Sequence, residues 1–257
     1  MPDPVAPAGR FVRLGPRLAT AALVLAPACG LAMLLAGIGY RQQWWGVGAG
    51  IRTMMGATGG ALAAALLAAL AIVAGVRGSS RRTVVLAAIA LVIAALVAAP
   101  PLAMARKSTR VPPIHDITTD TQDPPRFVAV VPLRAGAPNS LDYDPEVAAQ
   151  QRMAYPDIAP AMLDVPPARA LLLAEQAVRA MGWEIVTVSP HDLRIEATAT
   201  TRLFGFKDDV VVRIRSAPQG SRVDLRSVSR VGRSDLGANA ERVRAYLQTL
   251  HALGRGG

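Results

Sequence analysis

The chain has 257 residues, is 52% hydrophobic and carries a formal net charge of +10. Before residue 113 there are 11 Lys and Arg residues and one acid, Asp3, whereas the remainder holds 17 basic and 17 acidic residues. The excess charge belongs to the first part, where arginines bracket apolar runs. It therefore indicates a membrane protein and excludes a nucleic-acid-binding surface as its explanation.

Three apolar runs make up most of the first part. They cover residues 18–40, 54–76 and 83–105, and each has 23 residues without a charge. A helix of this length rises roughly 34 Å, enough to cross a ~30 Å hydrocarbon core. Residues 1–106 are therefore predicted to form a three-span membrane anchor. Because the runs contain no acid, base or histidine, they favour an anchor over an ion or substrate path.

Two details bear on the length and number of the spans. Pro100 and Pro101 lack the backbone donor that a helix needs, so the third span is expected to stop near Ala99. A cleaved signal peptide with a lipidated Cys29 is a weaker alternative, because the first apolar run continues to Tyr40. Cys29 is the only cysteine, which leaves no internal disulfide to consider.

Arginines near the short loops predict the orientation. The segment before the first run and the loop between the second and third runs lie on one side and hold Arg10, Arg13, Arg17, Arg77, Arg81 and Arg82. Arg41 and Arg52 lie in the opposite loop. Short loops rich in Arg and Lys stay in the cytoplasm. We therefore predict a multi-pass inner-membrane protein with a cytoplasmic N-terminus and a periplasmic C-terminal domain.

Residues 107–164 form a Pro-rich, acidic arm. Prolines interrupt any long element there. A short strand at 127–133 (FVAVVPL) and a short helix at 146–154 are the expected elements. Residues 114–164 hold eight acids and three bases, whereas residues 165–257 hold fourteen bases and nine acids. The opposite charges predict that the arm lies against the following domain.

Residues 165–257 show the periodicities of an α+β domain. Apolar residues recur at helical spacing after Pro167 and stop at Gly182. Four segments of alternating polarity follow, and a second amphipathic helix covers about 238–253. We predict a helix, a four-stranded antiparallel meander and a helix, with both helices on the apolar sheet face. The other face carries Arg194, Glu196, Arg213, Arg215, Arg222, Asp224 and Arg226.

Five stretches resemble a known family. They are IHDITTDTQDPPRF at 114–127, YPDIAP at 155–160, MGWEIV at 181–186, FGFKDDVVVR at 204–213 and VDLRSVSRVGRSDLGANAE at 223–241. Over about residues 112–253 the chain resembles the bacterial membrane-associated family called domain of unknown function 1499. That resemblance implies no established activity. More weakly, the layout is similar to the helix-grip domains of an outer-membrane-assembly lipoprotein, which implies a binding and assembly module by analogy.

The arginine-rich face and the segment before the last helix form the candidate site. Arg213 and Arg226 lie on that face, and Arg230, Arg233 and Asn239 surround two glycines where the last helix begins. Guanidinium groups and a helix N-terminus both suit phosphate or carboxylate. The anion is expected to belong to an envelope protein, a lipid head group, the cell wall or the acidic arm itself. The plain alternative is a helix cap and a tight turn.

An envelope hydrolase or transferase using Asp208 and Asp209, or His115, is the second hypothesis. It requires a cleft in which these groups converge, although neighbouring residues in a strand point to opposite faces. Neither a metal site nor a cofactor motif is predicted, because ligand clusters and phosphate-binding fingerprints are missing from the sequence. We therefore favour a non-enzymatic binding module, with the lipid bilayer as its first partner and no role for nucleic acid.

Overall fold

The computed structural model of the chain describes residues 9–255. The chain divides into two compact units. The first contains the chain up to Arg106 together with Leu203–Gly205, and the second contains Lys107–Arg202 and the residues from Phe206 onward.

The first unit is built from three long helices. They are α1 (Arg10–Arg41), α2 (Val47–Arg77) and α3 (Arg81–Ser108). Within the described residues, these three are long and apolar enough to cross a membrane. The three predicted spans are therefore present as helices, and each helix is longer than its apolar run.

Alanine forms the seam between the helices. Successive layers contribute one alanine from each helix, and these are fully buried: Ala19, Ala71 and Ala87; Ala22, Ala68 and Ala90; Ala26, Ala64 and Ala94. Small side chains let helix backbones approach closely. At Gly60 an added Cβ would lie 2.6 Å from the Cys29 sulfur. The large side chains point away from the seam, as at Leu66 and Leu96.

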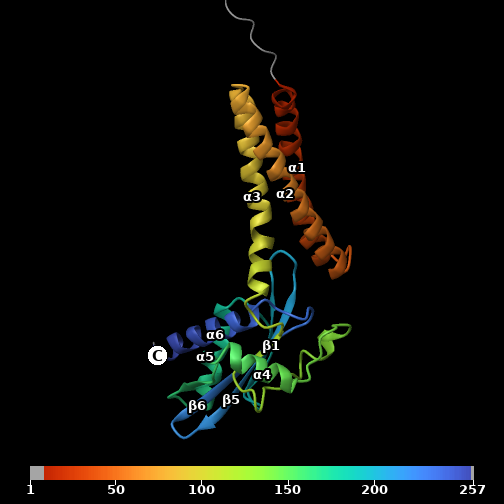
Figure 1. Ribbon diagram of the computed structural model, residues 1–257. Helices are drawn as coiled ribbons and strands as arrows, with labels where there is room; N and C mark the ends of the chain where they lie inside the picture. Colours follow the sequence, from red (N-terminus) through yellow and green to blue (C-terminus); the bar gives the residue numbers. More distant parts are fainter. Residues whose placement is uncertain (1–8, 256–257) are drawn as a thin grey trace, which may run out of the picture. The chain divides into compact units, whose positions relative to one another are not determined.

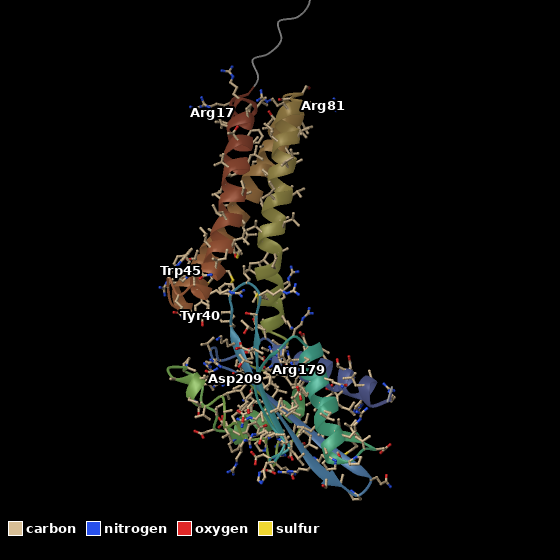
Figure 2. The ribbon with its side chains drawn as sticks, turned by 180° about the vertical axis from the view of Figure 1, so that it is seen from behind. Arg17, Tyr40, Trp45, Arg81, Arg179 and Asp209 are labelled. Carbon is tan, nitrogen blue, oxygen red and sulfur yellow. The ribbon has the colours of Figure 1, made fainter. Side chains whose placement is uncertain are left out.

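Both arginine-rich segments of the first unit lie at the same end of the helices. The Arg77 guanidinium lies 5.9 Å from the centre of the Phe11 ring. Figure 2 shows Arg17 and Arg81 at this end and Tyr40 and Trp45 at the other. Two aromatic residues at the end of a span are typical of a membrane–water interface. The prediction that these two segments lie at the same end of the helices is confirmed.

The expected end of the third span near Ala99 was wrong. Helix α3 continues through Pro100 and Pro101 to Ser108. Each proline forfeits one backbone hydrogen bond, but ending the helix inside an apolar run would leave several backbone groups without partners. The helix therefore ends only where polar residues follow.

The second unit contains a sheet that is larger than expected. The four predicted strands are β3 (Glu184–Ser189), β4 (Arg194–Thr200), β5 (Lys207–Ala217) and β6 (Gly220–Ser229), and each neighbouring pair is antiparallel. Two short strands from the arm, β1 (Asp116–Thr118) and β2 (Ala161–Leu163), pair with the outer edge of β6. The strand order is β1-β6-β5-β4-β3, and β2 also pairs with β6. The described sheet therefore has six strands, whereas a four-stranded meander was expected (Figure 1).

Two helices cover the apolar face of this sheet. They are α5 (Pro167–Ala180) and α6 (Ala238–Arg255), and both pack into one core with β4, β5 and β6. Trp183 stacks on Tyr246 with ring centres 5.6 Å apart, and the Tyr246 hydroxyl donates to the Ala174 carbonyl at 3.3 Å. Gly182, at a φ of +68°, turns the chain from α5 into β3.

The arm covers the other face, but it does so without the expected strand at 127–133. The backbone N–H groups of Val128 and Val130 each donate to a carboxylate oxygen of Glu196 at 2.9 Å. Phe127 and Val130 are buried against the sheet, and a 3-10 turn, η1 (Pro132–Arg134), follows. The Glu196 carboxylate accepts the hydrogen bonds that a neighbouring strand would otherwise accept. The apolar run therefore packs on the sheet as an irregular segment and not as a strand. The short helix was predicted correctly as α4 (Pro145–Ala154), which the Asp144 side chain caps.

Candidate anion-binding site

A buried ion pair joins the start of the arm to the centre of the sheet. Arg226 on β6 donates two hydrogen bonds to Asp116 on β1, at 3.0 and 2.6 Å. The guanidinium lies between the rings of Phe127 and Tyr143, 5.4 and 5.2 Å from their centres. Arg226 is only 3% exposed. Burial raises the pKa of Asp116, although Arg226 opposes this effect. Arg226 therefore fastens the arm.

Two further acids of the arm lie against arginines of the sheet. Asp120 accepts from Arg222 at 2.7 Å and from Arg213 at 3.4 Å. Asp123 accepts from Arg213 at 3.3 Å and from Arg215. The hydrogen bond from Arg215 lowers the pKa of Asp123 below its usual range. The predicted docking of the acidic arm on the basic domain is thus present as ion pairs.

Asp208 and Asp209 lie on opposite faces of β5. Asp209 is fully buried on the arm side, where Arg134 donates at 2.6 Å and Arg230 at 2.8 and 2.9 Å. Asp208 accepts from Arg242 of α6 on the helix side, at 2.5 Å. Burial acts to raise the pKa of Asp209, but hydrogen bonds from Arg230, Thr198 and Arg134 bring it below the usual value. The two carboxylates do not address one substrate.

The segment before α6 satisfies its own polar groups. The Asp235 carboxylate accepts the backbone N–H groups of Gly237 and Asn239, both at 2.7 Å, where a bound anion would otherwise lie. Asn239 is buried, and its side-chain amide donates to the His115 carbonyl at 3.0 Å. Arg230 is paired with Asp209, as described above. Arg233 is exposed, and its guanidinium has no ion pair within residues 9–255.

His115 lies next to this segment and not beside the paired acids of β5. Its Nδ1 atom is 3.3 Å from the Arg233 carbonyl oxygen. Within the described residues, no group of three or more His, Cys, Asp or Glu side chains is placed to hold a metal ion. The His115 ring therefore contacts the backbone of the segment before α6.

Four arginines lie together in one pocket, which we call the arginine pocket. It has a volume of about 240 Å³ and is lined by Asp123, Arg126, Asp192, Arg194, Arg213 and Arg215. Four guanidinium groups line it together with two carboxylates, and two buried carboxylates also pair with them, Glu196 with Arg194 and Asp224 with Arg213. Hydrogen bonds from Ser189 and His191 lower the pKa of Asp192, and Arg126 lies exposed beside these ion pairs.

Two arginines of the arginine pocket have donors to spare. The Nε of Arg213 is buried and has no hydrogen-bond partner. Arg126 is exposed and makes no ion pair within the described part of the chain. A buried guanidinium N–H without an acceptor is costly, and planar guanidinium groups hold phosphate or carboxylate by paired hydrogen bonds. The pocket is therefore suited to an anion.

A family model described as "Protein of unknown function (DUF1499)" matches residues 116–250, which is more than half of the chain. The chain belongs to the DUF1499 family. The match to DUF1499 begins with β1 and ends in α6, so it includes the arm as well as the domain that follows. All six residues that line the arginine pocket lie inside it. No curated protein and no solved structure matches the chain, so the likeness to helix-grip domains stays a prediction.

The five predicted site residues thus have different positions in the DUF1499 domain. Arg213 lines the arginine pocket, Arg226 is buried beneath the arm, and Arg230, Arg233 and Asn239 belong to the segment before α6. Sequence reasoning placed Arg194 and Arg215 on the correct face but did not assign them to the site. It missed Arg126 and Asp192, which lie in loops. The acidity of the arm was the one signal that could have drawn attention to Asp123.

Proposed function

We propose that the protein is a multi-pass inner-membrane protein that acts as a non-enzymatic binding and assembly module of the bacterial cell envelope. Its α+β domain lies in the periplasm and binds an anionic group through the arginine pocket. The anion belongs to an envelope protein, a lipid head group or the cell wall. Three apolar helices support the membrane attachment, and membership of DUF1499 adds no activity.

The exposed Arg126 guanidinium, next to an Asp123 carboxylate that two other arginines share, is the observation that carries this proposal. Most other arginines of the sheet face are bound by the arm, as Arg226 and Arg222 illustrate. In the pocket, Arg126 is exposed, and Arg215 and Arg213 share one partner, Asp123. Asp123 is itself more than half exposed. An external phosphate or carboxylate can therefore take over hydrogen bonds that Asp123 now accepts.

The geometry does not favour the second hypothesis. A hydrolase or transferase that used Asp208 and Asp209 together would need both in one cleft. They lie on opposite faces of β5, and each is held by arginine. We therefore do not propose these residues as a catalytic pair.

Removing the two most accessible guanidinium groups of the arginine pocket should weaken anion binding. For the full-length protein in nanodiscs, Arg126→Gln/Arg215→Gln is expected to raise the dissociation constant for inorganic phosphate at least about tenfold, because two charge-assisted hydrogen-bonding groups are lost. Isothermal titration calorimetry measures the change. Added salt should also weaken wild-type binding, because these side chains are exposed.

The matched control changes the same charge on α5. Arg169→Gln/Arg179→Gln replaces two exposed arginines outside the pocket and should leave phosphate binding unchanged. Arg226 is not used, because its burial means that a loss of binding would report a disrupted arm. Equal weakening in both double variants, or no phosphate binding by the wild type, would refute the proposal.

A reporter joined to the C-terminus tests the predicted orientation. Because the arginine-rich loop between α2 and α3 is expected to stay in the cytoplasm, alkaline phosphatase fused to the C-terminus should be active. The same enzyme inserted at Ser79, in that loop, should be inactive. The opposite pattern of activity would place the domain in the cytoplasm and contradict the proposed location.

A further inference from the structure

A larger groove adjoins the arginine pocket, and we call it the arm groove. Its volume is about 730 Å³, within the usual range for small-molecule sites. Asp123 and Arg126 line both the arm groove and the arginine pocket. A single ligand can therefore occupy both spaces, passing over the segment that contains these two residues.

The arm groove differs from the arginine pocket in charge. Arg134 and Arg226 reach the arm groove, but Asp209 and Asp116 neutralise them. The remaining charged lining consists of Arg126, shared with the pocket, and the acids Asp123 and Asp142. The arm groove thus has no surplus of positive charge, and the part of a ligand that lies in it should be uncharged.

The rest of the arm groove combines hydrogen-bonding groups with apolar side chains, among them Val131 and Leu141. Amide and hydroxyl groups come from Gln122, Asn139, Ser140 and Tyr143, and Phe127 lies among them. Carboxylates such as Asp142 accept hydrogen bonds from hydroxyl groups. Such a surface fits a ligand rich in hydroxyl groups. It suits an acyl chain less well, because the buried Tyr143 hydroxyl would stay without a partner, and it suits an acidic peptide less well, because the carboxylates would repel it.

Tyr143 provides an independent sign that the arm groove is a binding site. Its hydroxyl is buried and has no hydrogen-bond partner, and its ring lies against Arg226. Burial raises the pKa of this hydroxyl, so the group remains a donor at neutral pH. A buried donor without an acceptor is costly, and a ligand oxygen that satisfied it would be bound more tightly for that reason.

We infer that the ligand is a sugar phosphate, with its phosphate in the arginine pocket and its hydroxyl-bearing ring in the arm groove. This inference rests on the proposed anion binding and specifies its ligand. The phosphate binds Arg126 and the arginines that now share Asp123, and the ring supplies hydroxyl groups to Asp142 and an acceptor to Tyr143. The shared chemistry leaves two sources, a phosphorylated glycolipid head group or a sugar phosphate that is not attached to lipid.

The test compares three probes on the full-length protein in phosphatidylcholine nanodiscs. Glucose 1-phosphate should bind at least about tenfold more tightly than methyl phosphate, a monoester of the same charge, and glucose alone should bind weakly or not at all. Tyr143→Phe removes one hydroxyl and should reduce the preference for glucose 1-phosphate about fivefold, the effect of one hydrogen bond. Binding of methyl phosphate should be unchanged in this variant.

Tyr155→Phe is the matched control. Its hydroxyl is likewise buried without a partner, but Tyr155 packs beside Arg244 and does not line the arm groove. The variant should keep the full preference. Nanodiscs that contain a phosphorylated glycolipid identify the source: competition with glucose 1-phosphate assigns the ligand to lipid, and no competition assigns it to an unattached sugar phosphate.

The possible failures are distinguishable. If methyl phosphate and glucose 1-phosphate bind equally well, the sugar phosphate is rejected while the proposed anion binding stands. If neither binds, both proposals fail. Tighter binding of a hexaglutamate peptide than of glucose 1-phosphate would also overturn the inference, as would equal loss of preference in the Tyr143→Phe and Tyr155→Phe variants.

Discussion

Replacing Arg226 with alanine should lower the free energy of unfolding of the second unit by about 3–5 kcal/mol, the usual effect of leaving one partner of a buried ion pair without the other. Arg226 and Asp116 are both nearly inaccessible to solvent. The substitution also removes the contacts with the rings of Phe127 and Tyr143. Both effects act where the arm is fastened to β6, so the arm should detach at lower denaturant concentration than in the wild type.

Denaturant unfolding in detergent measures this change through the fluorescence of Trp183, in a background where Trp44 and Trp45 are replaced by phenylalanine. Arg215→Ala is the matched control, because Arg215 pairs with the exposed Asp123. Exposed pairs contribute about 0–1 kcal/mol. The double variant Asp116→Leu/Arg226→Met removes both charges and should recover most of the stability. A loss in Arg226→Ala no larger than in Arg215→Ala would contradict the assigned role of the pair.

Replacing Asp209 with alanine should have an effect of similar size, about 3–5 kcal/mol. The carboxylate is completely buried between Arg134 and Arg230, and Thr198, its third partner, donates a fourth hydrogen bond at 2.8 Å. Without it, the buried Arg134 keeps its charge and loses its counterion. The same unfolding experiment measures the loss. Asp157→Ala is the control, because Asp157 pairs with Arg244 at the surface, and it should change stability much less.

The pH dependence should separate Asp209 from the other buried acids. Its pKa is lower in the folded chain than in the unfolded one, so its stabilising effect is complete above the unfolded value of ~3.9 and is lost as the pH falls through the folded value. Burial raises the pKa of Asp116 and Asp235. The contribution of these two acids to the free energy of unfolding therefore has the opposite sign and falls as the pH rises. In Asp209→Asn, stability should decline less steeply below about pH 4 than in the wild type.

The regular elements could be predicted because their burial pattern repeats along the chain. Ile195 and Ala197 face the helices and Glu196 faces the arm, as their alternation indicated. The arm could not be predicted in this way. Strands β1 and β2 have three residues each, too few for a period to emerge. The run at 127–133 has the composition of a strand, but its backbone donors bind the Glu196 side chain, which local sequence does not reveal.

The sequence predicted the face on which the sheet arginines lie, but not which residues line the arginine pocket. Alternation placed Arg213 and Arg226 on one face, and the charge of the arm indicated an acidic cover. The arm pairs with some arginines of the sheet and leaves others accessible, and this depends on the positions of Asp116 and Asp123. These two acids are about a hundred positions away in the sequence from the arginines that they bind. Arg126 and Asp192 enter the arginine pocket from two unrelated loops. Convergence of this kind depends on tertiary structure and leaves no local pattern.

The pairing of the arm with β6 also sets an order for biogenesis. Asp116 and Arg226 are separated by 110 positions, and at the usual speed of synthesis, about 5–20 residues per second, the partner of Asp116 is made roughly 5–20 s later. During that delay the newly emerged acidic segment has no strand to join. The first strand of the nascent domain therefore stays solvated until β6 has left the ribosome, and a product truncated before β6 would leave that strand unpaired.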